Sequence, residues 1–154
     1  MTDGKVLGIF ICPKAGEPMV EVSEVEAFER AGLAGDRYAT GAGSGNKGAQ
    51  GKRQVTLING LFIPNSGFTF TETRRNIVTM GVELNYFIGR GEFKIGGVRM
   101  RAVKYCDSCE RPNTLSGNKR SFRDTFFDRG GIIAEVVEGG IIRVGDTIVP
   151  PPRG

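Results

Sequence analysis

The stretch GIIAEVVEGGIIRVGDTIV, residues 131–149, contains three short runs rich in Ile and Val that glycines separate from one another. Short runs of β-branched residues bounded by turn residues predict strands and not helices. The stretch therefore predicts a succession of short strands joined by tight turns. This organisation is typical of a β-barrel or a β-sandwich.

A second stretch, IGRGEFKIGGVRM (residues 88–100), aligns without a gap with residues 137–149 of the first. The matched pairs are Gly91 with Gly140, Phe93 with Ile142, Ile95 with Val144, and Gly96 with Gly145. A glycine inside a strand pattern marks a bulge or a bend. We therefore predict two neighbouring barrel hairpins, each bent at its central glycine. Convergence explains the similarity of the two stretches better than an internal repeat does.

The rest of the chain repeats this strand pattern. Three more runs are rich in Val, Ile or Phe: KVLGIFI (5–11), RQVTLI (53–58) and RRNIV (74–78). Helical periodicity is weak, and only SFRDTFFDRG (121–130), with Ser121 as its cap, predicts a short helix. The pattern as a whole predicts an all-β barrel with one or two short helices.

Two other segments interrupt the strands. VELNYFIG (82–89) predicts a single helical turn. ATGAGSGNKGAQGKR (39–53) is rich in glycine and ends in a basic pair, which predicts a disordered or lid-like loop.

The composition is that of one globular domain. The 154 residues are 39% hydrophobic and 25% charged, which argues against disorder. No apolar run approaches the ~20 residues that cross a bilayer, and the N-terminus is too weakly basic for a signal peptide. An odd number of cysteines, three, indicates free thiols in a reducing compartment. We expect a single cytoplasmic domain over residues 1–154, without a membrane segment.

Charge and residue types narrow the function. A net charge of +4 suits a small anionic ligand as well as nucleic acid. Aromatic residues are only 8% and do not alternate with basic ones as a base-stacking surface requires, which disfavours nucleic acid. The chain has no histidine, which excludes His-based acid–base pairs, triads and metal sites.

Two cysteines stand three residues apart in RAVKYCDSCERPN, residues 101–113. Cys106 and Cys109 could form half of a zinc site, but only Cys12 remains as a thiol ligand, so we expect no structural zinc. A thioredoxin-type redox pair usually opens a helix, whereas this pair follows a strand and precedes a turn-like RPNTLSG.

Zinc binding and a dithiol redox role are thus disfavoured, and two other interpretations of the pair carry more weight. The thiols could be incidental neighbours at a strand end. Alternatively, one of them is a nucleophilic or metal-ligating thiolate at the mouth of the barrel, with a pKa lowered by Lys104 and Arg111. The residue pattern makes the second interpretation the leading one.

Two further motifs carry arginines. In AGLAGDRYA (31–39), Asp36 could orient Arg37, or Arg37 could grip an anion, and an exposed ion pair of little consequence explains the motif equally well. In TETRRNIVTMGVELN (71–85), Arg74 and Asn76 would share one face of a strand. That face suits a phosphate or a polar heterocycle, although a charged, solvated sheet edge is the simpler alternative.

Taken in order, these stretches resemble the MOSC domain, named for the C-terminal domain of molybdenum cofactor sulfurases. The resemblance covers nearly the whole chain. It is carried by GIFICPKAGEPM, GLAGDRY, QVTLI, RRNIVTMGVELNYFIGRGEFKIGGVRM, YCDSCERPN and RGGIIAEVVEGGIIRVGDTI.

The resemblance implies a MOSC-type β-barrel with one key cysteine, which corresponds to Cys109. That thiol would carry sulfur as a persulfide or ligate molybdenum, and Cys106 would be its helper. Relatives such as the mitochondrial amidoxime-reducing components contact the pterin of the molybdenum cofactor (molybdopterin) through an Arg-x-Asn motif. The cofactor-binding residues implied here are Asp36, Arg37, Arg74, Arg75 and Asn76.

The chain also departs from the family pattern. Tyr38 stands where many members have His. We do not expect the additional N-terminal barrel of reductase-type members. A sulfur-carrier or cofactor-binding domain is therefore expected, with a cysteine-desulfurase-like donor or molybdenum-cofactor biosynthetic proteins as partners. The alternatives are a sulfur transferase or cofactor-dependent reductase of N-hydroxylated compounds, and a non-catalytic basic barrel that binds a partner protein or nucleic acid.

Overall fold

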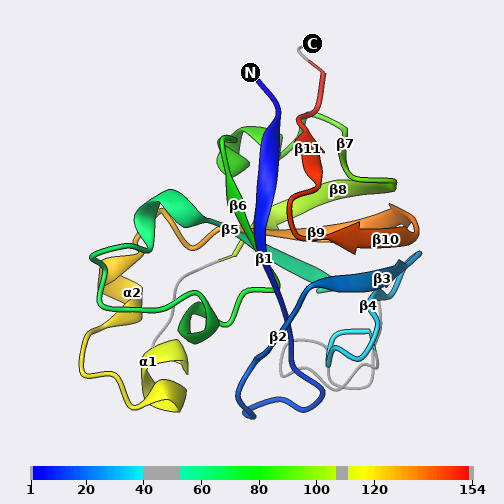
Figure 1. Cartoon of the computed structure of the whole chain (residues 1–154). Coiled ribbons are helices and arrows are strands. Elements are labelled where there is room, and N and C mark those ends of the chain that lie inside the picture. Colours follow the sequence, from blue (N-terminus) through cyan, green and yellow to red (C-terminus); the bar gives the residue numbers. More distant parts are fainter. Residues whose placement is uncertain (1, 40–52, 107–110, 153–154) are drawn as a thin grey trace.

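The computed structural model describes residues 2–39, 53–106 and 111–152, which form a mostly β structure (Figure 1). The strands are β1 (Gly4–Ile11), β2 (Val20–Val22), β3 (Glu24–Phe28), β4 (Gly32–Leu33), β5 (Val55–Asn59), β6 (Ile77–Met80), β7 (Glu92–Ile95), β8 (Val98–Tyr105), β9 (Ile132–Glu138), β10 (Gly140–Arg143) and β11 (Thr147–Val149). The helical segments are the 3₁₀ turns η1 (Gly60–Phe62), η2 (Thr71–Thr73) and η3 (Leu84–Phe87), and the short helices α1 (Arg111–Ser116) and α2 (Phe122–Thr125).

Within the described residues, seven strands close into a barrel. They follow the order β11-β7-β8-β9-β5-β6-β1, and the pairing of β1 with β11 completes the ring. Only the β5–β6 pair in this ring is parallel. Strand β2 extends β1 outside the ring, while β10, β3 and β4 form a second, smaller sheet. The predicted all-β barrel with one or two short helices is confirmed.

The two stretches that align with each other have different roles in this barrel. Strands β7 and β8 form the predicted hairpin, in which Ile95 pairs with Val98 across a turn at Gly96 and Gly97. Gly96 has a φ of +57°, as a two-residue hairpin turn requires. The second predicted hairpin is wrong, because β10 pairs with β3 whereas β11 pairs with β1 and β7. The two stretches are nevertheless neighbours, as predicted, through the β7–β11 pairing.

Apolar side chains fill the barrel interior and a second cluster outside it. On β5, Val55 and Leu57 belong to the interior cluster, while Ile58 belongs to the outer one. This alternation follows from the two-residue period of a strand. The outer cluster includes Phe122 and Phe126, whose rings stack with centroids 4.6 Å apart. The α2 segment therefore covers the outer side of the barrel, away from the two chain ends (Figure 1).

The helical predictions are confirmed in two places and wrong in one. Helix α2 begins after Ser121, whose hydroxyl accepts a hydrogen bond from the Asp124 amide, and η3 is the predicted single turn. The RPNTLSG stretch, in contrast, forms helix α1 and not a turn. Pro112 in its first turn and Gly117 after its last residue, with a φ of +72°, are ordinary helix boundaries. The predicted loop over residues 39–53 lies almost wholly outside the described residues.

Candidate functional site

The Arg-Arg-Asn stretch lies in a turn that precedes a strand. Strand β6 begins at Ile77, and Arg74 has a left-handed backbone with a φ of +60°. The prediction that Arg74 and Asn76 share one face of a strand is therefore wrong, because side chains alternate regularly only on an extended chain. The three side chains of the stretch contact three different parts of the protein.

Asn76 links strands β1 and β5 in the interior. Its Oδ1 atom accepts hydrogen bonds from the Thr56 main-chain nitrogen at 2.9 Å and from the Thr56 hydroxyl at 3.1 Å. Its Nδ2 atom donates to the Phe10 carbonyl at 3.0 Å. Both ends of the fully buried amide are thus used by the protein itself. Asn76 therefore acts as a structural link between the two strands.

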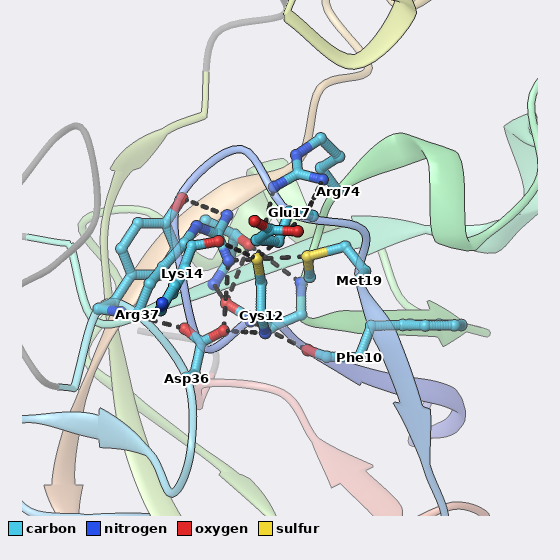
Figure 2. A network of polar contacts seen from close by, with 11 residues as sticks. Phe10, Cys12, Lys14, Glu17, Met19, Asp36, Arg37 and Arg74 are labelled. Carbon is cyan, nitrogen blue, oxygen red and sulfur yellow. Dashed lines mark hydrogen bonds and ion pairs between the residues drawn. The ribbon is translucent and has the colours of Figure 1, made fainter. Parts of the chain in front are cut away.

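Asp36 is fully buried and fixes the residue that follows β1 (Figure 2). Its Oδ1 atom accepts a hydrogen bond from the Cys12 main-chain nitrogen at 2.8 Å and one from Arg37 Nη1 at 3.2 Å. The Arg37 main-chain nitrogen in turn donates to the Cys12 carbonyl at 2.7 Å. The Gly-Asp-Arg turn therefore holds Cys12 through both of its main-chain polar groups.

Tyr38 completes the surroundings of Arg37. The Arg37 guanidinium lies 4.1 Å from the centre of the Tyr38 ring, and its Nη2 atom donates to the Tyr38 hydroxyl at 2.8 Å. The arginine is only 5% exposed. Tyrosine at this position thus supplies both a stacking face and an acceptor for the buried cation.

Arg74 reaches the same cluster from the other side (Figure 2). Its Nη1 atom donates to the Glu17 carbonyl at 2.7 Å, and its Nη2 atom lies 3.6 Å from Cys12 Sγ. The Cys12 thiol donates to the Lys14 carbonyl at 2.7 Å. Arg74 and Cys12 together therefore fix the loop between β1 and β2.

The sequence predicts that Arg37, Arg74 and Asn76 converge on one concave surface with Cys109. Arg37 and Arg74 lie around Cys12 in the interior, whereas the Asn76 amide bonds to Thr56 and Phe10, and each of the three residues is at most 8% exposed. Cys109 lies outside the described residues, so its place beside them stays a prediction. Cys12 is fully buried next to the end of β1.

Cys106, the first cysteine of the pair, lines a pocket of about 690 Å³ where β8 ends. The thiol-bearing residue is 4% exposed, and its main-chain nitrogen donates to the Gly131 carbonyl at 2.9 Å. The other lining residues are Asn85, Tyr105, Arg123, Asp124, Phe127, Asp128, Gly130 and Gly131. The described residues of the lining therefore combine a soft sulfur atom, two aromatic rings, one cation and two carboxylates.

Arg75 supports this pocket from behind. Its Nε atom donates to the Gly130 carbonyl at 2.8 Å, and its Nη1 atom donates to the Thr73 carbonyl at 3.2 Å. The guanidinium lies 5.3 Å from the centre of the Phe122 ring, and the residue is 6% exposed. Arg75 thus joins the Arg-Arg-Asn turn to the glycines that form part of the pocket wall.

In the described part of the chain, no three Cys, Asp or Glu side chains are grouped to hold a metal ion. The expected absence of structural zinc stays a prediction. The helices described here include none that is long and apolar enough to cross a membrane.

The stability of the protein should depend on the ionisation of Asp36. Burial raises the pKa of this carboxyl above 3.8, against the opposing effect of the Arg37 guanidinium and of hydrogen bonds from Cys12, Tyr38 and Asn76. A raised pKa means that the folded state binds the proton more tightly than the unfolded state. The contribution of Asp36 to stability therefore falls as the pH rises from about 3.8 through the folded-state pKa.

We expect the free energy of unfolding of the wild type to decline over this range relative to that of Asp36→Asn, which cannot ionise. Urea unfolding of both proteins at a series of pH values measures the difference. A wild type that gains stability relative to the variant as the pH rises would contradict the raised pKa of Asp36 in the folded state.

The protein is a small closed β-barrel with a cysteine-lined pocket at the end of one strand. A family model, the MOSC domain, matches residues 53–149. The chain belongs to the MOSC domain family, which is generally related to the molybdenum cofactor. A comparison with curated protein sequences gives no match.

Solved structures of bacterial proteins share the fold. The YuaD protein from Bacillus subtilis is 15% identical, with a TM-score of 0.77 over 96% of this chain and 94% of that one. YiiM from Geobacillus stearothermophilus is 12% identical, with a TM-score of 0.69 over 98% and 76%. YiiM from Escherichia coli is 14% identical, with a TM-score of 0.64 over 97% and 71%. At these identities the likeness shows the fold alone.

Sequence reasoning found Cys106 but missed the residues around it. Arg123, Phe127 and Asp128 follow or belong to α2, far along the chain from the cysteine. The one sequence signal near these residues is the predicted cap at Ser121. It predicts a short helix after residue 121 but not which part of the protein that helix contacts. Tyr105 precedes Cys106 directly and could have been noticed as an aromatic residue at a strand end.

Proposed function

We propose that this chain is a molybdenum-cofactor-related domain that uses Cys109 either to carry sulfur as a persulfide or to ligate molybdenum. The observation that supports the proposal is that Cys106, three residues before Cys109, lines the pocket of about 690 Å³. A volume of this size is typical of small-molecule sites. The family relationship supplies the class of ligand.

The chemical types of the pocket residues are compatible with the metal and the phosphate of the cofactor. A cysteine sulfur is a soft ligand that suits a thiophilic metal, and the Arg123 guanidinium is a suitable partner for a phosphate. Asp124 and Asp128 line the same pocket, so an anionic group would have to lie against Arg123 and away from them. The cofactor, when bound, would supply a redox-active metal.

The sulfur-carrier role requires a balanced exchange between thiols. The Cys109 thiolate would attack the sulfane sulfur of a donor persulfide, forming a new S–S bond while the donor leaves as a thiolate. Attack of the Cys106 thiolate on Cys109 would then release hydrosulfide and leave a disulfide between the two cysteines. A cysteine-desulfurase-like protein is the kind of donor that this chemistry needs.

Native mass spectrometry of protein purified from a molybdenum-replete host tests the proposal. We expect the intact protein to carry the added mass either of one molybdopterin-type cofactor or of one sulfur atom, and the Cys109→Ser variant to carry neither. The two mass increments distinguish cofactor binding from sulfur transport. Wild-type protein that carries no adduct, even after incubation with a persulfide donor, would contradict both forms of the proposal.

A further inference from the structure

The two adjacent arginines of the Arg-Arg-Asn turn contact different cysteine-bearing segments. Arg74 donates to the Glu17 carbonyl and contacts the Cys12 sulfur, in the loop after β1. Arg75 donates to the Gly130 carbonyl, next to the residue that accepts the hydrogen bond of the Cys106 amide. The turn therefore couples one guanidinium to the buried thiol and the other to the thiol of the pocket.

We propose that Arg75 is a positioning residue that holds Cys106 at the pocket by clamping the Gly130–Gly131 segment. The connection is short and consists of main-chain groups. Arg75 Nε donates to Gly130 at 2.8 Å, and the Gly131 carbonyl accepts from the Cys106 nitrogen at 2.9 Å. The family resemblance implies a different role for this arginine, contact with a cofactor.

The clamp acts where three strands meet. Strand β9 begins at Ile132, which pairs with Tyr105 of β8 on one side and with Leu57 of β5 on the other. The segment just before it crosses β5 closely, because a Cβ atom added at Gly131 would meet the Leu57 carbonyl oxygen. A segment that is confined on one side by β5 and bonded on the other to Arg75 has little freedom to move.

The surroundings of the guanidinium make this hydrogen bond strong. Arg75 is 6% exposed and lies against the Phe122 ring, so water competes poorly for its N–H groups. The Nη1 atom of the same side chain donates to the Thr73 carbonyl at 3.2 Å, which fixes the orientation of the planar guanidinium. Lysine cannot reproduce two donors in a rigid planar geometry.

The inference deepens the proposed function, because it concerns the same pair of cysteines, but its test is independent of sulfur or cofactor. In a Cys109→Ser background, only Cys12 and Cys106 remain to be alkylated by iodoacetamide under native conditions. We expect Arg75→Met to raise the rate at Cys106 by about tenfold relative to the rate at Cys12, the change that loss of one charge-assisted hydrogen bond produces. Peptide mapping of the alkylated protein measures both rates.

Arg74→Met is the matched control, because Arg74 is adjacent, equally buried and bonded to the other cysteine segment. We expect this variant to shift the ratio in the opposite direction, toward Cys12. The rate at Cys12 also reports global unfolding in the Arg75 variants, so general destabilisation cannot imitate the result. Urea unfolding of each variant gives the same control independently.

Arg75→Lys keeps the positive charge and replaces Arg75→Met in the alkylation experiment if Arg75→Met does not fold. We expect Arg75→Lys to raise the Cys106-to-Cys12 ratio by a smaller factor than Arg75→Met, because one flexible donor replaces the planar fork. Slower hydrogen exchange at the Cys106 amide in the wild type than in Arg75→Lys should accompany this change. A ratio that is the same in the wild type and in the Arg75 variants would overturn the proposal, whatever the outcome for sulfur transport.

Discussion

Replacing Gly131 with alanine is expected to lower the free energy of unfolding by more than about 4 kcal/mol, a loss that exceeds those of ordinary substitutions. Gly131 has a φ of +91°, and a Cβ atom added to it would clash with the Leu57 carbonyl oxygen. That oxygen belongs to strand β5, which pairs with β6 and β9 and cannot move aside alone. Since domains of this kind are stable by only about 5–15 kcal/mol, such a loss removes a large part of the total stability.

Gly145→Ala separates the two causes of this effect. Gly145 has nearly the same φ, +92°, but no atom beyond its chain neighbours lies within 4 Å of the Cβ position. Its substitution should therefore cost only the conformational penalty, about 1–2 kcal/mol. Urea midpoints of both variants measure the difference, with recovery of soluble protein as a second readout. Equal losses for the two variants would show that β5 accommodates the methyl group.

The barrel itself could be predicted because its strongest signals are local. Residues 92–102 alternate apolar and polar residues around a glycine pair, and that pattern nearly fixes the β7–β8 hairpin. Strands β9 and β11 follow from their runs of Ile and Val. The pairing of β10 with β3 could not be predicted in the same way. After a tight turn a strand can join either of two sheets, and contacts distant in sequence decide between them.

Strand β3 and helix α1 were missed for a different reason. Glu24–Phe28 alternates exposed and buried residues, as a half-buried strand does, but its glutamates make it look like a polar loop. The stretch after Cys109 contains a proline and a glycine, which mark turns and helix boundaries equally well. Its six-residue helix is too short for apolar periodicity to decide between them.

The arginine motifs show the limit of reading a site from residue types. Arg37, Arg74 and Arg75 are the cations that an anionic cofactor would need, and the family resemblance implies that they bind it. In the structure, their described contacts include main-chain carbonyls, a carboxylate and a tyrosine hydroxyl of the protein itself. Carbonyl acceptors leave no mark in the sequence, so the internal use of a guanidinium is visible only once the chain is folded.

The other large effect is expected at Cys109. Substitution by serine should reduce the uptake of sulfur from a persulfide donor by about tenfold or more, because the thiolate is the attacking species and buried thiols are poorly reactive. Cys12 is fully buried and Cys106 is 4% exposed, so neither is well placed to replace it. Mapping of modified peptides after limiting incubation with the donor, or with iodoacetamide, measures which cysteine reacts first.

Two further variants decide what the other cysteines contribute. Cys106→Ser should still accept sulfur but release it less readily, because the disulfide that expels hydrosulfide can no longer form. Cys12→Ser should leave uptake unchanged, because the Cys12 thiol donates to the Lys14 carbonyl inside the β1–β2 loop and a serine hydroxyl can donate there instead. If Cys12 or Cys106 is modified first, or if Cys109→Ser takes up sulfur normally, the working thiol has been assigned to the wrong residue.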